Sequence, residues 1–238
     1  IDYFLGRKAN ELDNDLERVA TDELLPFPEW ETLPYDRFSP HQDLVSERLK
    51  TLFRLPTMQN GILILPVSTL MQRVVPADYV VQHSFILKVS QTLDANLFAQ
   101  RLEANSYSRV SQVMEHGEFA IRGSIMDVFP MGSTTPYRID LFDDEVESIR
   151  KFDPETQRTT GQVAQIELLP AKEIDLTEQG LANFRNNFRS HFGEERLQSE
   201  AYQAITQGQA IGGVEYYLPL FHEKLDSLFD YLPENSLF

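Results

Sequence analysis

The sequence lacks several features that would define large classes of proteins. It contains no cysteine among its 238 residues, which excludes disulfide bonds and thiolate metal sites and fits a reducing compartment. It also lacks long apolar runs: residues 61–67 form one of the longest, far below the roughly 20 residues that a transmembrane helix needs. No signal-peptide pattern stands at the start. We therefore expect a cytoplasmic location.

Positive charge is also scarce. The chain has 21 Lys and Arg residues against 37 Asp and Glu residues, a formal net charge of −16, and acidic residues outnumber basic ones in each third of the sequence. Proteins that hold nucleic acid tightly carry a basic footprint over the phosphates. The composition therefore argues against tight, direct nucleic-acid binding by this piece. The hydrophobic share of 42% is ample for folded cores.

Catalytic and metal-binding patterns are missing as well. No G-x-x-x-x-G-K-[ST] phosphate-binding loop occurs, and residues 5–8, with a single glycine before Arg-Lys, do not make one. The histidine pairs His41 with His83 and His191 with His222 lack the short spacing of a metal site. We assign no catalytic residue, no metal ligand and no cofactor to this sequence.

The first 83 residues show strand and helix patterns in alternation. Residues 1–5 resemble a short buried strand, and residues 7–19 have apolar side chains at helical spacing. A proline-rich connection follows, and then Ser39 and Pro40 predict the cap and first turn of a second helix. Residues 62–67 are typical of a strand buried on both faces. This order predicts an α/β layer.

Residues 113–153 are the most informative stretch. We interpret them as two strands around a Gly-Ser-Thr-Thr-Pro turn, followed by a third strand. In the first strand, alternation puts Phe119, Ile121 and Ile125 on an apolar face and turns Glu118 and Arg122 away from it. With the strand and helix patterns before it, this stretch predicts a small inserted α+β domain.

Phe142 is the anomaly of the second strand. Tyr137, Ile139 and Leu141 form one face of that strand, whereas Arg138, Asp140 and Phe142 form the other. An aromatic side chain flanked by arginines has the composition of a binding hot spot. Alternatively, Arg122 and Arg138 simply pair across strands with Glu118 and Asp140. The pattern alone leaves both interpretations open.

Several segments together resemble one known family. They are FPEWETLPYDRFSPHQDLVSERLKTLFRL at 27–55, GILILPVSTLMQRV at 61–74, HGEFAIRGSIMDVFPMG at 116–132, PYRIDLFDDEVESIRKFDPETQR at 136–158 and GVEYYLPLF at 213–221. In content and order they are similar to the amino-terminal UvrB-homology module of bacterial transcription-repair coupling factors. Those proteins are large multidomain motors, so we expect this chain to be a piece of a longer polypeptide.

The resemblance implies a fold and a division into domains. It implies an α/β fold in which a degenerate helicase-like, UvrB-like layer carries an inserted small α+β domain and a helical lobe. Residues 1–83 are then the first part of the α/β domain, residues 84–170 the inserted UvrA-binding domain, and residues 171–238 the helical lobe with the return to the α/β domain. It also implies that this module has lost ATP binding and is not itself an enzyme, although the parent protein resembles an ATP-dependent DNA translocase.

The same resemblance implies partners and site residues. The inserted domain is the docking site for the repair protein UvrA, and the residues that match the docking positions are Arg122, Arg138 and Phe142, with Glu118 and Asp140 in support. An alanine at Arg138 or Phe142 is then expected to weaken UvrA binding without changing the melting temperature. Contacts with RNA polymerase and DNA are expected only through the rest of the parent protein.

Two alternatives follow from the same resemblance. One is a UvrB-type ATPase that handles damaged DNA directly, although the interval that resembles UvrB's tyrosine-rich hairpin has no tyrosine cluster here. The other is a mainly autoinhibitory module, in which the same face docks on other domains of the full-length protein.

Overall fold

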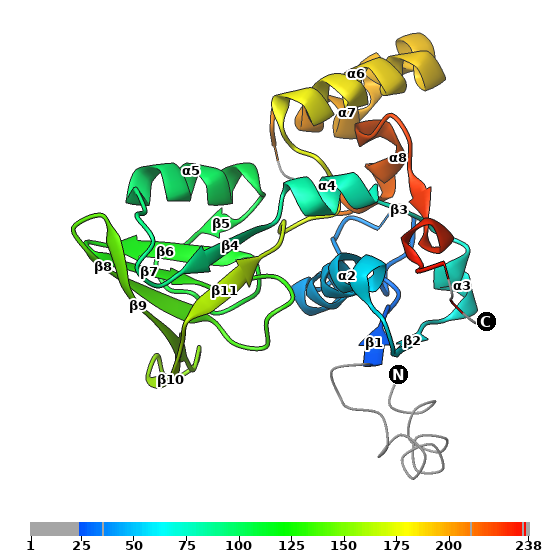
Figure 1. Ribbon diagram of the computed structural model, residues 1–238. Helices are drawn as coiled ribbons and strands as arrows, with labels where there is room; N and C mark the ends of the chain where they lie inside the picture. The colour runs from blue at the N-terminus through cyan, green and yellow to red at the C-terminus, as the bar shows by residue number, and fades with distance from the viewer. Residues whose placement is uncertain (1–23, 35, 210, 235, 237–238) are drawn as a thin grey trace.

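The computed structural model describes residues 24–34, 36–209, 211–234 and 236 (Figure 1). It is a mixed α/β structure whose largest sheet has six strands. The predicted strand at 1–5 and helix at 7–19 lie outside the described residues. None of the helices in the described ranges combines the length and apolarity required to cross a bilayer.

The elements have the following bounds. The α-helices are α2 (Gln42–Arg54), α3 (Val67–Leu70), α4 (Ala77–Gln82), α5 (Ala95–Ala104), α6 (Glu178–Phe192), α7 (Glu200–Thr206) and α8 (Leu218–Phe221). The strands are β1 (Leu24–Pro26), β2 (Ile62–Ile64), β3 (Arg73–Val74), β4 (Phe85–Lys88), β5 (Ser108–Arg109), β6 (Glu118–Arg122), β7 (Ile125–Val128), β8 (Tyr137–Phe142), β9 (Glu145–Phe152), β10 (Thr159–Val163), β11 (Gln165–Leu168) and β12 (Asp226–Ser227). The 3-10 helices are η2 (Leu55–Thr57), η3 (Gly193–Gln198), η4 (Val214–Tyr217) and η5 (Leu228–Tyr231).

The six-stranded sheet and α5 form what we call the sheet unit. The strand order is β10-β9-β8-β7-β6-β5, with β5 parallel to β6 and every other neighbour antiparallel. The chain enters this unit through β4 and leaves it through β11, and these two strands pair with each other antiparallel. The unit stands at the left of Figure 1, with α5 over the sheet.

A tight turn corrects the predicted strand arrangement. The segment read as a single strand from residue 117 is two strands, β6 and β7, joined at Gly123 and Ser124. Gly123 has φ +63°, the left-handed conformation that a two-residue hairpin requires and that glycine adopts without strain. Arg122 therefore lies directly opposite Ile125. Cross-strand partners share a face, so Ile125 lies on the arginine face, not on the apolar one as predicted.

Helix α2 belongs to two hydrophobic cores. Val45 and Leu49 pack in the core of the sheet unit, whereas Leu52 packs with β1 and α4 in a second core. The helix begins after His41, whose Nδ1 accepts a hydrogen bond from the amide of Asp43 at 3.3 Å. The predicted cap, Ser39, was wrong.

Ser39 has a different, long-range role. Its hydroxyl donates to Glu215 Oε2 at 2.7 Å and accepts from the amide of Gly213 at 3.3 Å, which ties the start of α2 to the helical lobe. The side chain that the local pattern assigned to a helix cap thus bonds to Glu215, 176 positions away in the sequence.

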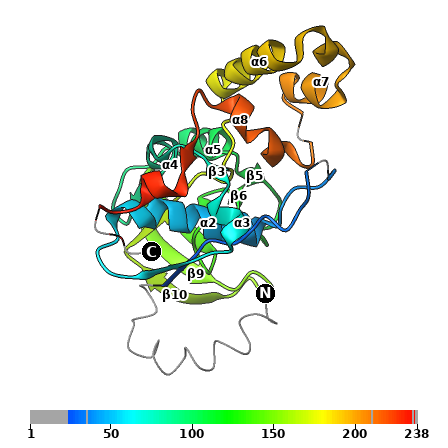
Figure 2. The same ribbon diagram turned by 90° about the vertical axis from the view of Figure 1, so that its right-hand side faces the viewer.

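Helices α6, α7 and α8 lie together in the upper part of Figure 2. With η4 they form the helical lobe, which has a third core that includes Phe184. Its aromatic residues pack against one another: Phe184 stacks on Phe221 and makes a tilted ring contact with Phe188. Before η4, a Cβ at Gly212 would collide with the carbonyl of Arg37. Glycine is required there for close backbone approach.

The two-stranded sheet of the first part is small. Strands β1 and β2 pair in parallel, with Leu24 opposite Ile62, and β3 pairs antiparallel with β12. Ile62 and Ile64 are partly exposed, so β2 is not buried on both faces as predicted. A parallel pair with helices around it is compatible with a UvrB-like layer, but that specific layering stays a prediction.

A buried ionic junction connects the three cores. Arg48 on α2 and Glu173, just after β11, pair with Nε to Oε1 at 2.6 Å, and their side chains are 0% and 2% exposed. Arg48 also donates to the carbonyl of Pro28 at 2.9 Å, and the indole of Trp30 donates to Glu173 at 3.2 Å. Trp30 thus attaches the proline-rich connection to Glu173. From the helical lobe, His222 contacts the backbone carbonyl of Glu173 at 3.4 Å.

Candidate partner-binding site

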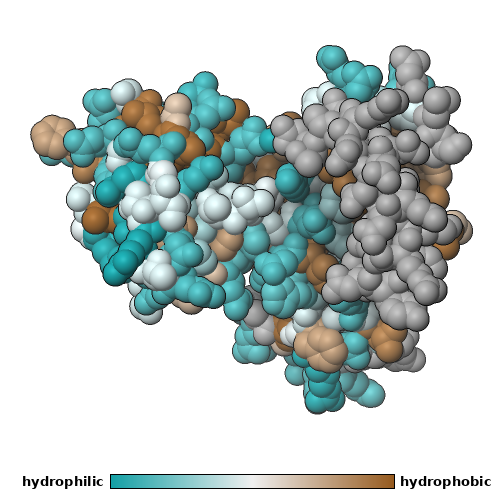
Figure 3. Space-filling model, turned by 90° about the horizontal axis from the view of Figure 1, so that it is seen from below, coloured by the Kyte–Doolittle hydropathy of each residue, from teal (hydrophilic) through white to brown (hydrophobic). Residues whose placement is uncertain are grey.

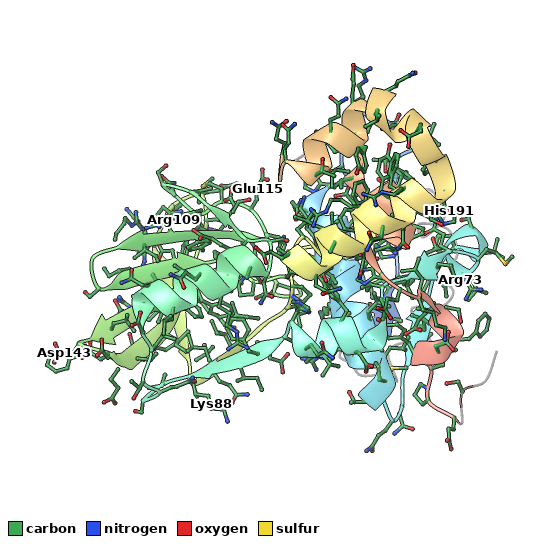
Figure 4. The ribbon with its side chains drawn as sticks, turned by 90° about the horizontal axis from the view of Figure 1, so that it is seen from above. Arg73, Lys88, Arg109, Glu115, Asp143 and His191 are labelled. Carbon is green, nitrogen blue, oxygen red and sulfur yellow. The ribbon has the colours of Figure 1, made fainter. Side chains whose placement is uncertain are left out.

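The outward face of β7 and β8 carries the polar residues that the sequence singled out. Ile139 and Leu141 of β8 are buried in the core of the sheet unit, so alternation turns Arg138, Asp140 and Phe142 to the opposite face. β8 has the predicted bounds and the predicted faces. Its last residue lies at the far end of the sheet unit, where Figure 4 labels the next residue, Asp143.

A buried carboxylate joins the two predicted arginines. Asp127 of β7 has a side chain that is 0% exposed. Arg138 binds it with two parallel hydrogen bonds, Nε to Oδ1 at 2.7 Å and Nη2 to Oδ2 at 2.9 Å. Arg122 Nη2 donates to the same Oδ2. The structure thus brings Arg122 and Arg138 together, but through a residue that the sequence analysis did not name.

The supporting residues have other partners. Asp140 binds Arg150 of β9, with Oδ1 to Nη2 at 2.6 Å and Oδ2 to Nε at 2.8 Å, and it accepts from the hydroxyl of Ser148. Glu118 accepts the amides of residues 114 and 115, which closes the loop before β6. The predicted direct pairs of Arg122 and Arg138 with Glu118 and Asp140 are therefore replaced by the pairs with Asp127.

Hydrogen bonding to Asp127 raises the pKa of Arg138, against the effect of burial, and the charges of Asp127 and Asp140 act in the same direction. Arg138 therefore stays charged. Its Cζ also lies 4.8 Å from the ring centroid of Phe152. We call the set Arg122, Asp127, Arg138, Asp140 and Arg150 the arginine patch.

The arginine patch has the opposite sign to the chain as a whole. Three guanidinium groups and two carboxylates leave it with one excess positive charge, whereas the chain carries −16. Asp127 is the most deeply buried member of the patch, and the side chains of Asp140 and Arg138 are each 17% exposed. Arg122, at 50% exposed, is the most accessible charge. The patch therefore exposes Arg122 and Arg150 to solvent above the buried carboxylate of Asp127.

Phe142 stands at the tip of the β8–β9 hairpin and is 70% exposed. Asp143, with φ +50°, begins the turn. Arg122 of β6 pairs with Ile125 of β7, which in turn pairs with Asp140 of β8. Arg122 and Asp140 are therefore two strands apart, with about 10 Å between their backbones. Phe142 follows Asp140 by two residues on the same face, so it and Arg122 lie toward the same end of the sheet.

The opposite end of this face is closed by a small core of its own. Val113, Ala120, Phe129 and Phe152 are buried together there. Seen from below, the sheet unit at the left of Figure 3 shows mainly hydrophilic surface with separate hydrophobic areas. An isolated, highly exposed aromatic ring beside paired charges is the arrangement of a binding anchor rather than of a missing core.

Comparisons with known proteins give a consistent result. The family model of the UvrB interaction domain matches residues 85–174. The transcription-repair-coupling factor of Haemophilus influenzae is 47% identical over 233 residues, 98% of this chain and 20% of that protein. The one from Escherichia coli is 45% identical over 232 residues, 97% of this chain and 20% of that protein. The one from Rickettsia prowazekii is 36% identical over 216 residues, 90% of this chain and 19% of that protein.

Over nearly its whole length, this chain is similar to transcription-repair-coupling factors. It spans about a fifth of the length of those relatives. The match to the interaction domain begins at the first residue of β4 and ends at Ile174, just after the junction residue Glu173, so it contains the whole arginine patch and Phe142.

Asp127 and Arg150 are the site residues that sequence reasoning missed. The sequence analysis placed Phe119 to Ile125 on one strand, and only the turn at Gly123 puts Asp127 between Arg122 and Arg138. The signal was available, because a glycine followed by serine between two apolar runs is a hairpin pattern. Arg150 carried no comparable signal, since its pairing depends on the register of β8 and β9.

Proposed function

We propose that this chain is a non-catalytic adaptor module that binds UvrA through the arginine patch and Phe142. In the parent protein it would recruit nucleotide excision repair to RNA polymerase stalled at DNA damage, with polymerase and DNA contacted by regions outside this chain. The similarity to transcription-repair-coupling factors and the match to the UvrB interaction domain support this proposal. The sequence also lacks a phosphate-binding loop, which supports a role without ATP as a cofactor.

The exposure of Phe142 carries the proposal. A phenylalanine at 70% exposure, beside a locally cationic patch in a strongly acidic chain, is matched to a partner surface with an apolar recess bordered by carboxylates. Such a partner would desolvate the ring and meet the guanidinium groups at its rim. Docking of the same face on other domains of the parent protein stays a prediction, because those domains lie outside this chain.

Isothermal titration calorimetry with purified UvrA tests the proposal. We expect Phe142→Ala to weaken binding by more than about 2 kcal/mol, as for a hot-spot anchor, while the melting temperature stays unchanged because the ring makes no core contact. Leu97→Ala is the matched control, since Leu97 is 63% exposed on α5, outside the patch. Equal affinity of Phe142→Ala and the parent chain would refute the proposed site.

Binding of Mg-ATP separates the adaptor from the UvrB-type ATPase. The adaptor predicts no saturable binding of a fluorescent ATP analogue by this chain at millimolar Mg²⁺. Saturable binding that unlabelled ATP displaces would favour the ATPase alternative.

A further inference from the structure

Arg138 is committed to contacts within the chain. A guanidinium has five N–H donors. Arg138 uses one on each oxygen of Asp127 and a third on the carbonyl of Gln157 at 3.3 Å. Its side chain is only 17% exposed and it adjoins the ring of Phe152. The edge of Arg138 that offers two parallel bonds is therefore already occupied by Asp127.

Arg122, in contrast, has most of its hydrogen-bond donors available. Its guanidinium makes one hydrogen bond, from Nη2 to Asp127, and its side chain is 50% exposed. Among the residues that the structure describes, its four remaining N–H groups have no recorded acceptor. Arg122 is therefore the arginine of this pair that can still offer two parallel hydrogen bonds to a carboxylate outside the chain.

Asp127 accepts hydrogen bonds from both arginines. Its carboxylate is fully buried and is neutralised mainly by Arg138 from the neighbouring strand, which leaves Oδ2 to receive Arg122 as well. Arg122 is the last residue of β6, beside a two-residue turn, and within the described part of the chain its side chain forms a hydrogen bond and an ion pair with Asp127 alone. A fixed acceptor on Nη2 reduces the number of conformations that a partner must select.

We propose that Asp127 is a positioning residue that holds Arg122 for contact with UvrA, and that Arg138 acts through Asp127 rather than by contacting UvrA with its own paired donors. This inference rests on the function proposed above and divides the predicted site into one contacting arginine, one supporting arginine and the carboxylate between them.

A double-mutant cycle in UvrA affinity tests the role of Asp127. We expect Arg122→Gln to weaken binding about 30-fold and Asp127→Asn about 10-fold, with the double variant within about threefold of Arg122→Gln alone, because both changes remove one interaction. If the double variant instead lost affinity by the product of the two single losses, the inference would be overturned. Such a product would mean that Arg122 contributes fully without Asp127, so that Asp127 has a purely structural role. Each affinity is measured at a temperature where the variant is fully folded.

Arg138 provides a second test that does not need a change at Asp127. Lysine at this position keeps a cation on the buried carboxylate but cannot form two parallel bonds to a partner. We therefore expect Arg138→Lys to retain affinity within about threefold of the parent chain and Arg138→Gln to lose about 10-fold. Equal losses in Lys and Gln would show that Arg138 contacts UvrA directly and would overturn the inference.

Phe142→Ala separates failure of the inference from failure of the proposed function. If Phe142→Ala weakens UvrA binding while Arg122 and Asp127 act independently, only the positioning role is wrong. If none of Phe142→Ala, Arg122→Gln and Asp127→Asn changes affinity, UvrA does not bind this face and both proposals fail.

Discussion

At the scale of single residues, the site is defined by a carboxylate that solvent does not reach. Asp127 needs both guanidinium groups, because a buried ionised carboxylate without partners is strongly unfavourable. The arginines that the sequence marked as contact residues therefore also stabilise the fold. This changes the expectation that alanine at Arg138 would leave the melting temperature unaffected.

We predict that Arg138→Ala lowers the free energy of unfolding by about 2 kcal/mol, because Asp127 loses two charge-assisted hydrogen bonds and keeps only Arg122. The midpoint of thermal unfolding should fall by roughly 4–8 °C for a chain of this size. Differential scanning calorimetry measures both values. An unchanged midpoint would show that other groups replace the hydrogen bonds that Asp127 loses.

His222 gives the molecule a pH dependence. Burial lowers its pKa below the usual 6.5, and the charge of His83 acts in the same direction, against opposing effects of the Glu173 carbonyl and Asp175. The folded state therefore favours neutral His222 more than the unfolded state does. Its contribution to stability is complete above about pH 6.5 and is lost as pH falls through the lowered pKa.

Urea denaturation at pH 7.5 and pH 5.5 tests this effect. We predict that the parent chain loses stability between these pH values and that His222→Phe, which preserves a ring against Tyr79, shows a smaller loss. The comparison uses the difference between the two pH values within each variant, so the lost contact with Glu173 cancels. The same pH difference in both proteins would contradict the role of His222.

At the scale of secondary-structure elements, the β6–β7 hairpin decides which residues form the site. Gly123 and Gly161 make a matched pair, because a Cβ at either position would meet no atom within 4 Å, but only Gly123 has a positive φ. We predict that Gly123→Ala lowers stability by about 1 kcal/mol and that Gly161→Ala is neutral. Chemical denaturation of both variants checks this. Equal effects would mean that backbone conformation at Gly123 is not limiting.

Elements with strong periodicity were predictable from sequence. Strand β8 was predicted with its two faces, because its apolar residues alternate with polar ones. The predictions that failed depended on long-range partners or on a turn. Ser39 bonds to Glu215 in another lobe, and Asp127 gains its place only when a hairpin folds back. The assignment of Phe142 to a binding site stays a prediction.

At the scale of the whole molecule, the Arg48–Glu173 pair connects the first part of the chain, the sheet unit and the helical lobe. We predict that Glu173→Gln lowers the free energy of unfolding by about 3 kcal/mol, because it leaves the buried guanidinium of Arg48 without its counter-charge. Glu167→Gln is the control, since its pair with Arg54 is exposed and should contribute less than about 1 kcal/mol. Guanidinium chloride denaturation compares the two.

Helix α2 has a further consequence for how the molecule moves in solution. Its residues Val45 and Leu49 lie in one core and Leu52 in another, so the sheet unit cannot swing on β4 and β11 without exposing apolar side chains of α2. The sheet unit and the first part of the chain should therefore tumble as a single particle. When a partner binds at Phe142, it therefore also fixes the orientation of α2 relative to that partner, although α2 lies away from the point of contact.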